Sequence, residues 1–376
     1  MSITHYFQRE ISIPTKGSIL LFGPRMTGKT SLLLKENFEA TYDLLNQDLE
    51  LKFRVRPELL FEECKKLPPG SRIFIDEVQK VPALLNSVQR GIDQLKQDYI
   101  LSGSSARKLK RGGANLLGGR ALDLKLYPLS QKELGSKFNL LQVLKFGTLP
   151  KIYSEQMMSE EIANDYLSSY VSTYIREEIQ AEAATRNIGA FQRFLPIAAQ
   201  SNAQTIQFET ISRESSTPAS TVKNYYQILE DTLLGLFLWP YSRSERKKIR
   251  PKFYFFDTGV VRALQNQIGI LPSSSEYGFL FETWMINECI RINEYEKKRF
   301  HFSFWRERKN EIDLCVSKGN KVILGAEFKW GPETIPSETS RKFHLTFPQA
   351  ELTLVSPHKN SPGITPLLFI QKLRNL

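Results

Sequence analysis

The stretch that decides the fold of the first third of this chain reads Gly23-Pro24-Arg25-Met26-Thr27-Gly28-Lys29-Thr30. An apolar run, 18–22, precedes it, and Ser31 followed by three leucines continues it, so the expected order is strand, loop, helix. Glycines let backbone N–H groups turn inward around phosphate oxygens, and the helix N-terminus adds the positive end of its dipole. The pattern therefore predicts a phosphate-binding loop in which residues 23–31 contact ATP. A chance glycine turn is the alternative, and the flanking strand and helix disfavour it.

Lys29, Thr30 and two carboxylates are expected to complete the ATP site. Lys29 is expected to reach the β- and γ-phosphates of ATP, and the Thr30 hydroxyl to bind Mg²⁺. Residues 72–77 read as a buried strand that ends in Asp76 and Glu77. We expect Asp76 to hold Mg²⁺ through its water shell and Glu77 to polarise the water that attacks the γ-phosphate. The alternative is a strand that runs into an acidic helix cap.

Length and composition indicate an ordinary globular protein. The chain has 376 residues, enough for two or three domains, with 41% hydrophobic and 24% charged residues. Of the net charge of +11, residues 1–150 contribute +8, which suits an acidic partner such as DNA but also serves solubility. The chain has three scattered cysteines, no N-terminal signal and no apolar run of about 20 residues. These features predict a cytoplasmic protein that makes no membrane contact.

The motifs of the first half resemble a known family. Residues 23–30, the run Asp-Glu-Val-Gln-Lys-Val-Pro at 76–82, Gly-Ser-Ser at 103–105, and the landmarks 119–120, 127–130 and 146–150 are similar to prokaryotic AAA-type ATPases that carry a conserved C-terminal domain of unknown function. The resemblance covers nearly the whole chain. It implies an α/β domain that hydrolyses ATP, and it implies no single cellular role.

The resemblance also suggests two further site residues. In AAA-type ATPases a polar sensor of the γ-phosphate follows the strand that corresponds to 98–103, so Ser104 or Ser105 is a candidate, although a plain turn is equally consistent. Arg120 ends a glycine-rich basic loop, 107–120, and is a candidate arginine finger in cis or across a subunit boundary. The alternative for Arg120 is a solvated basic loop.

The middle of the chain has a helix-turn-helix pattern. Residues 161–200 look helical, with an aromatic stripe that we interpret as core. A short helix at 208–213 and a turn at 215–218 precede a second helix at 219–231, with Thr217 as N-cap and Pro218 at the first helical position. The strand expected at 253–257 is preceded by a cluster of basic residues, where the wing of a winged helix would lie: Arg243, Arg246, Lys247, Lys248, Arg250 and Lys252. The residues expected to contact DNA are Thr221, Lys223, Asn224, Gln227, Lys247 and Lys248. A winged helix that only packs against the ATPase is the alternative.

The last third predicts a cluster of carboxylates. A helix at 277–293 carries Glu282, and strands follow at 300–306, 311–316 and 322–329. Glu327 and Lys329 are two residues apart and share a sheet face, Asp313 lies on the neighbouring strand, and Glu282 points in from the helix. We expect Asp313 and Glu327 to bind Mg²⁺, and Lys329 to orient a water and stabilise charge on a phosphodiester.

The order Glu, Asp, Glu-x-Lys resembles the PD-(D/E)XK nuclease superfamily, with Ile312 in place of the proline. The alternative is a nuclease-like fold kept as a binding platform, in which these charges form a buried salt-bridge cluster. The expected fold is thus α/β: an AAA-type ATPase domain (1–150), a helical linker with a winged helix (151–262) and a nuclease-like domain (263–376). Three functions remain open: an ATP-gated, Mg²⁺-dependent nuclease on DNA, an ATP switch with a protein or nucleic-acid partner, and an ATPase motor on DNA. A homo-oligomer fits each of them.

Overall fold

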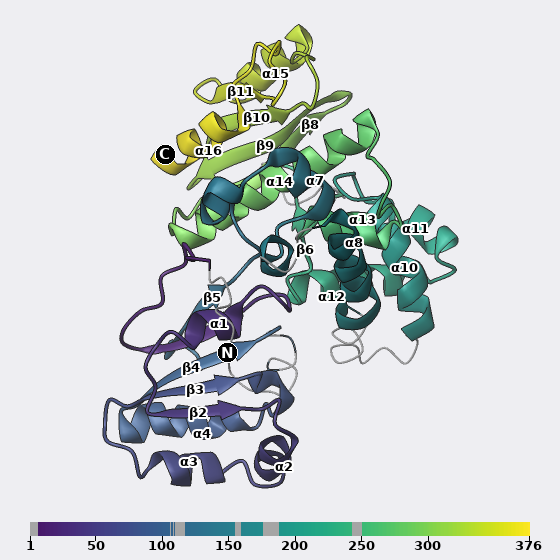
Figure 1. Ribbon diagram of the computed structural model, residues 1–376. Coiled ribbons are helices and arrows are strands. Elements are labelled where there is room, and N and C mark those ends of the chain that lie inside the picture. Colours follow the sequence, from purple (N-terminus) through teal and green to yellow (C-terminus); the bar gives the residue numbers. More distant parts are fainter. Residues whose placement is uncertain are drawn as a thin grey trace.

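The computed structural model describes residues 7–105, 107, 109, 117–154, 159–175, 188–242 and 250–376. Figure 1 shows a parallel sheet at the N-terminal end, a group of helices beside it and a second sheet at the C-terminal end. Lys247 and Lys248, both expected to contact DNA, lie outside the described residues. Within the described part, no helix combines the length and apolar character needed to cross a membrane.

The first sheet is five-stranded and parallel, in the order β2-β3-β4-β1-β5. Its strands are β1 (Ser18–Phe22), β2 (Ala40–Asp43), β3 (Arg72–Asp76), β4 (Asp98–Gly103) and β5 (Ala121–Lys125). The helices around it are α1 (Lys29–Leu33), α2 (Gln47–Val55), α3 (Leu59–Cys64) and α4 (Leu84–Arg90), with short turns η1 (Val78–Lys80) and η2 (Gly91–Leu95). Because β4 lies between β1 and β3, the phosphate loop, Ser104 and Asp76 meet at one edge of the sheet.

The middle of the chain is mainly helical. Its elements are α6 (Gln131–Leu134), η3 (Gly135–Lys137), α7 (Leu140–Phe146), η4 (Pro150–Tyr153), α8 (Glu160–Ser169), η5 (Tyr170–Ile175), α10 (Ile188–Gln200), α11 (Phe208–Glu214), α12 (Ala219–Asp231), β6 (Gly235–Leu238), β7 (Lys252–Phe255) and α13 (Thr258–Leu264). Strands β6 and β7 form an antiparallel pair. The expected order of two helices followed by a strand is therefore present.

Helix α12 has the expected bounds, 219–231, and packs through the expected face, but its N-cap differs from the prediction. Val222, Tyr226 and Leu229 are fully buried. The N-cap is Pro218, and the Thr217 hydroxyl instead donates to the carbonyl of Ser215 at 3.0 Å, so the prediction of Thr217 as N-cap is wrong. Phe and Tyr rings of α10, α12 and β7 form the local core, because aromatic side chains bury much area for each residue.

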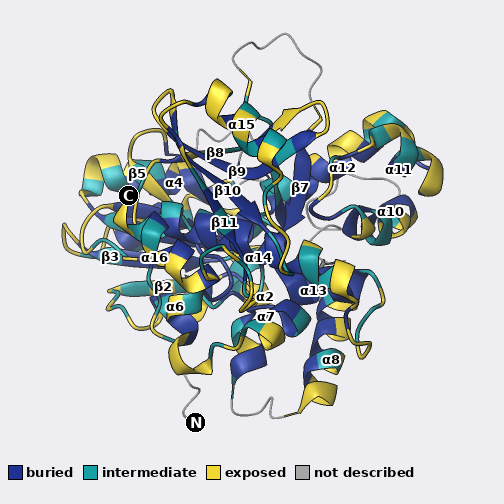
Figure 2. Cartoon of the chain, turned by 90° about the horizontal axis from the view of Figure 1, so that it is seen from above, coloured by how far each residue is buried: buried dark blue, intermediate teal, exposed yellow. Residues whose placement is uncertain are grey.

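The C-terminal part is a four-stranded sheet with helices on it. Its elements are α14 (Ser274–Tyr295), β8 (His301–Glu307), β9 (Asn310–Lys318), β10 (Lys321–Phe328), α15 (Ser337–Thr346), β11 (Glu351–Val355) and α16 (Pro366–Asn375). The strand order is β11-β10-β9-β8, and only β10 and β11 run parallel. Figure 2 shows α14, β9 and β10 largely buried.

The middle and C-terminal parts share one hydrophobic core. A single cluster of buried side chains extends from Leu129 to Leu373 and includes residues of α10, α12, α14 and α16. Main-chain hydrogen bonds join the segment after β6 to β8: Phe304 N donates to the Trp239 carbonyl at 3.1 Å. The helical middle therefore packs directly on the C-terminal part.

Candidate functional site

The phosphate loop has the expected residues in place. Lys29 is buried at the start of α1, and its Nζ donates to the carbonyls of Gly23 at 2.8 Å and Pro24 at 3.1 Å. Gly28 has φ +92°, a left-handed conformation that costs a glycine little. The lysine is thus held inside its own loop, with the ammonium group where phosphate oxygens are expected.

The two expected Mg²⁺ residues contact each other. Thr30 Oγ1 donates to Asp76 Oδ2 at 2.7 Å, and the Ser102 hydroxyl donates to Asp76 Oδ1. Asp76 is 3% exposed and also accepts from the Glu77 N–H at 3.1 Å. A hydroxyl and a carboxylate are ligands that suit Mg²⁺, either directly or through water. These residues therefore fit the metal that an AAA-type ATPase uses.

Gln79, which the sequence analysis gave no role, joins two candidate residues. Its Nε2 donates to Glu77 Oε2 at 2.5 Å and to Ser104 Oγ at 3.1 Å. Glu77 has a left-handed φ of +56°, the kind of strained backbone that clusters at functional sites. A Cβ on Gly103 would lie 2.4 Å from Gln79 Oε1, so only glycine leaves room for this side chain. Two features of the sequence could have pointed to Gln79: its position within the 76–82 motif and the Gly103-Ser104 pair.

Arg120 lies away from the loop. It immediately precedes β5, and Ala121 pairs with Ser18 at the beginning of β1, whereas the phosphate loop follows the end of β1. About 16 Å of strand separate these two edges of the sheet. Arg120 Nε instead donates to Asp93 Oδ1 at 2.8 Å. Within one chain Arg120 does not reach the phosphate loop in this conformation, and its role across a subunit boundary stays a prediction.

The outer face of α12 carries the expected polar residues. Lys223, Asn224 and Gln227 are exposed and Thr221 is half-buried. Asn224 Oδ1 also accepts from Arg107 at 3.4 Å, and Gln227 Nε2 donates to acidic residues at the end of the same helix at 3.0–3.1 Å. This face therefore lies partly against the segment that follows β4, and DNA contact by these residues stays a prediction.

The structure brings the four expected residues of the C-terminal cluster together. Lys329 Nζ lies 2.6 Å from Glu327 Oε1, and the Phe328 N–H donates to Asp313 Oδ2 at 3.0 Å. Glu282, in α14, faces the same cluster. Glu282, Asp313 and Glu327 are all at most 9% exposed. Among the described residues, however, no group of three or more His, Cys, Asp or Glu side chains is already arranged to hold a metal.

A lysine from outside the C-terminal part lies among these carboxylates. Lys252 Nζ, on β7, contacts Glu282 Oε1 at 2.7 Å, Glu311 Oε1 at 2.8 Å and Asp313 Oδ1 at 3.1 Å. Tyr254 also donates to Glu282 Oε1, at 2.6 Å. The sequence analysis placed Lys252 with the exposed basic residues of the expected wing. That interpretation is wrong, because Lys252 is 3% exposed.

Burial and mutual repulsion perturb the acids. Burial, with Asp313 nearby, raises the pKa of Glu282 to about 7. Burial and the same neighbour raise the pKa of Glu327 to about 8. Burial disfavours the charge on Lys252, but the surrounding acids, Glu282 foremost, outweigh it and hold the Lys252 pKa well above its usual value. Glu282 and Glu327 therefore hold their protons to a higher pH than ordinary glutamates do.

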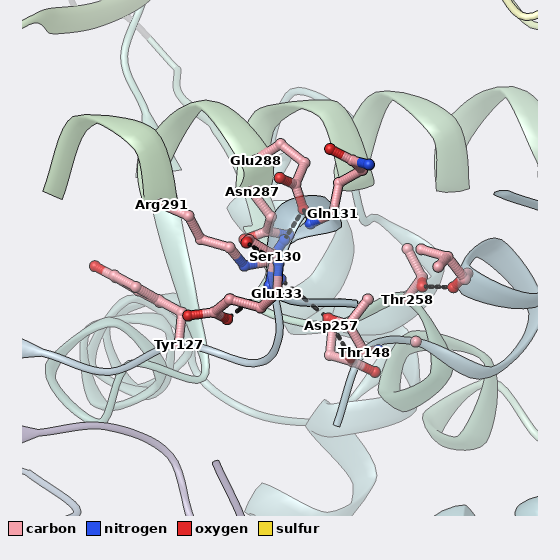
Figure 3. Close-up of polar contacts among 12 residues, drawn as sticks. Tyr127, Ser130, Gln131, Glu133, Thr148, Asp257, Thr258, Asn287, Glu288 and Arg291 are labelled. Carbon is pink, nitrogen blue, oxygen red and sulfur yellow. Dashed lines mark hydrogen bonds and ion pairs between the residues drawn. The ribbon is translucent and has the colours of Figure 1, made fainter. Parts of the chain in front are cut away.

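A buried polar network joins the three parts of the chain (Figure 3). Arg291, on α14, is 2% exposed; its Nη1 lies 2.7 Å from Glu288 Oε1 and its Nη2 donates to Thr148 Oγ1 at 3.2 Å. The Gln131 N–H donates to the same Glu288 oxygen at 3.1 Å, and the Thr148 N–H donates to Asp257 Oδ2 at 2.6 Å. Since unpaired buried groups are costly, these contacts hold the parts in one arrangement.

Arg9 connects this network to the phosphate loop. It donates to the carbonyls of Thr27 and Tyr127, both at 2.6 Å, to Glu133 Oε1 at 2.9 Å and to the Tyr295 hydroxyl at 3.4 Å. Tyr295 ends α14, the same helix that carries Glu282. Helix α14 therefore carries Glu282 of the C-terminal cluster and, through Tyr295, contacts the arginine that binds the phosphate loop. No signal in the sequence assigned this role to Arg9.

The loop also contacts the helical middle. The Tyr170 hydroxyl, in η5, donates to the Arg25 carbonyl at 3.0 Å. The ring of Tyr170 lies 6.4 Å from that of Phe256, which follows β7. The helical middle therefore contacts the backbone of the phosphate loop directly.

Comparisons with known proteins agree with the first part of this picture. Residues 15–135 match the AAA domain family, residues 137–270 a domain of unknown function (DUF8612) and residues 277–366 another domain of unknown function (DUF4143). The expected domain boundaries at residues 150 and 262 stay a prediction. With the parallel sheet and the loop geometry, the expected AAA-type P-loop domain is confirmed for residues 15–135.

Two relatives that match most of this chain are described as uncharacterized proteins. An uncharacterized protein of Haemophilus influenzae is 24% identical over 86% of this chain and 85% of its own length. An uncharacterized protein of Methanocaldococcus jannaschii is 24% identical over 83% of this chain and 74% of its own. The solved structure of Aeropyrum pernix ORC1 protein in complex with DNA aligns with 67% of this chain and 87% of its own, at 14% identity and a TM-score of 0.26, a likeness too low to indicate a shared overall fold.

Proposed function

We propose that this chain binds ATP with Mg²⁺ and hydrolyses it. The observation that carries the proposal is the 2.7 Å contact between Thr30 and Asp76, next to a buried Lys29 inside the phosphate loop. Lys29 and Thr30 begin α1, which follows β1, and Asp76 ends β3; they lie at the same end of the sheet because β1 and β3 both run parallel to β4, which lies between them. The AAA domain match over residues 15–135 supports it.

The roles follow from the contacts. ATP supplies the γ-phosphoryl group, and Mg²⁺ neutralises charge on its oxygens. Lys29 exchanges its two loop carbonyls for phosphate oxygens, and Thr30 and Asp76 hold the metal and its water. Glu77 polarises the attacking water, while Gln79 holds the Glu77 carboxylate and the Ser104 hydroxyl in one line of hydrogen bonds. Ser104 is then placed to report the γ-phosphate.

ATP turnover and nucleotide binding, measured separately, test this proposal. Lys29→Ala is expected to lose ATP binding, whereas Glu77→Gln is expected to bind ATP and fail to hydrolyse it. Glu58→Gln is a matched control, because Glu58 is exposed at the start of α3 and pairs only with Arg56 at 3.1 Å among the described residues. Normal turnover by Glu77→Gln would remove Glu77 from the role of catalytic base.

We also propose a Mg²⁺-dependent nuclease site in the C-terminal part. The supporting observation is that Glu282, Asp313, Glu327 and Lys329 lie together although they come from three elements. The buried Glu327 Oε2 has no hydrogen-bond partner among the described residues, so the donor set has room for a cation. Asp313 and Glu327 would hold the metal, which supplies a Lewis acid for the phosphodiester. Lys329 orients the water and stabilises developing charge.

Cleavage of single- and double-stranded DNA with Mg²⁺ or Mn²⁺, with and without ATP, tests the nuclease. Cleavage that Lys329→Ala loses and Lys309→Ala keeps would support it, since Lys309 is 81% exposed and lies outside the cluster. The absence of cleavage by wild type under every condition would favour an ATP switch, in which the cluster holds the fold. DNA-stimulated turnover without cleavage would favour a motor.

DNA is the partner that this proposal includes. Residues 208–255 have the helix and strand order of a winged helix, and α12 presents Lys223 and Gln227 outward. The basic segment 243–250 follows in the sequence. A homo-oligomer would bring Arg120 of one copy toward the nucleotide of another. We also propose that the protein acts in the cytoplasm and that its chain has three domains, 1–150, 151–262 and 263–376.

A further inference from the structure

We propose that the ammonium group of Lys252 and a divalent cation compete for the carboxylates of Glu282 and Asp313. This inference rests on the C-terminal metal site proposed above, and it adds the residue that controls the loading of that site. Lys252 belongs to β7, in the helical middle of the chain, so the group that decides whether metal enters comes from outside the nuclease-like part.

The contacts of Lys252 resemble those of a bound cation. An ammonium group has three N–H donors, and Nζ has three carboxylate oxygens at 2.7, 2.8 and 3.1 Å. Two of these oxygens belong to Glu282 and Asp313, which come from α14 and β9. Carboxylates that converge from separate elements on one point are the usual surroundings of a hard cation. Lys252 therefore takes a position that the acids would otherwise offer to metal.

The charges of the cluster leave room for a second positive charge. Glu282, Glu311, Asp313 and Glu327 supply four carboxylates, and Lys252 and Lys329 supply two ammonium groups. Glu327 Oε2 is buried without a hydrogen-bond partner among the described residues, and the Glu327 side chain is 9% exposed. Replacing one ammonium group by a divalent cation would reduce the excess negative charge and give Oε2 a partner.

Lys252 is held firmly in the present arrangement. Its main chain pairs with Leu238 in β6, and its ammonium group lies 5.7 Å from the centre of the Phe304 ring. Phe253, the next residue, is 1% exposed. The ammonium group leaves the acids only if its side chain rotates away or the β6–β7 hairpin shifts. Metal loading is therefore expected to be poor in the wild type and to improve when the charge at position 252 is removed.

Metal rescue of Lys252→Met tests this competition. Methionine keeps an unbranched apolar stem and removes the charge. Without nucleotide and with a chelator, we expect the variant to melt about 5–10 °C below wild type, because buried acids lose their partner. Mn²⁺ or Mg²⁺ should restore at least half of that loss, and Mn²⁺ should bind at least about tenfold tighter than to wild type. Adding Asp313→Asn to the variant should abolish both effects.

The control is Lys145→Met, which removes a lysine whose side chain is 12% exposed and pairs with Glu160 at 2.5 Å, outside the cluster. Metal should not change its melting temperature. The proposal is overturned if Lys252→Met gains no stability or affinity from metal, if it does not fold even with metal, or if nucleotide-free wild type already binds Mn²⁺ as tightly. These readouts involve no DNA, so a protein that shows rescue but never cleaves would refute the nuclease alone.

Discussion

Arg107 and Asp231, which are 124 residues apart in the sequence, form an ion pair at 2.7 Å. The arginine follows β4 of the AAA domain, and the aspartate is the last residue of α12. The Arg107 side chain is 9% exposed, and it also reaches Asn224. The helix expected to contact DNA is thus bound to the segment that follows the candidate γ-phosphate sensor.

This ion pair predicts a measurable coupling. Arg107→Met and Asp231→Asn should each lower the free energy of unfolding, and the double variant should lose less than the sum, by about 1 kcal/mol. Denaturant unfolding of the four proteins gives this coupling energy. Strict additivity would show that the contact does not stabilise the fold.

Gln79 should matter for turnover more than for binding. Glu77→Gln is expected to lower kcat by about 10²–10⁴-fold, as loss of a general base does. Gln79→Leu should lower kcat by a smaller factor and leave ATP binding intact, because it removes the group that orients Glu77. Parallel measurements of turnover and of nucleotide binding check both effects. An equal loss of binding in Gln79→Leu would instead indicate damage to the loop.

Arg9→Met should destabilise the protein strongly. It removes four hydrogen bonds and leaves the Glu133 carboxylate, whose side chain is 0% exposed, without its ion-pair partner. Breaking a buried pair costs about 3–5 kcal/mol, so a similar drop in the free energy of unfolding is expected. Glu133→Gln in the same background should recover part of it. A loss below about 1 kcal/mol would contradict a structural role for Arg9.

The pair of Glu10 and Arg374 predicts a dependence of stability on pH. Burial acts to raise the Glu10 pKa, but hydrogen bonds from Arg374, at 2.7 and 2.9 Å, outweigh burial and hold it below its usual value. A lowered carboxyl pKa stabilises the fold above the unfolded value of about 4.3, and this contribution disappears as the pH falls through the folded value. Arg374→Ala should therefore cost about 1–2 kcal/mol near neutral pH and less at about pH 4.

DNA binding through α12 predicts a change in salt dependence. If Lys223 contacts a phosphate, Lys223→Ala should weaken binding to all sequences alike and lower the slope of log K against log salt by about 1. Lys309→Ala, in the C-terminal part, serves as the control. An unchanged slope and affinity would remove α12 from the DNA interface.

The sequence predicted what depends on local pattern and missed what depends on distant packing. Residues 23–30 and Asp76 carry their roles in short motifs, and the alternation at Glu327 and Lys329 placed both on one face. Lys252 looked like one more exposed basic residue, because its acidic partners lie 30–61 residues further along the chain. Arg9 was missed for the same reason, since its contact with Tyr295 spans 286 residues. Arg120 was expected near the nucleotide, and only strand register revealed its distance.

One continuous helix, α14, carries Glu282 near its beginning and Tyr295 at its end. The thirteen residue steps from Glu282 to Tyr295 correspond to about 20 Å of helix. Through Arg9, which contacts both Thr27 and Tyr295, this helix ties the phosphate loop to the carboxylates. The distance between the two sites is therefore set by a single element of secondary structure.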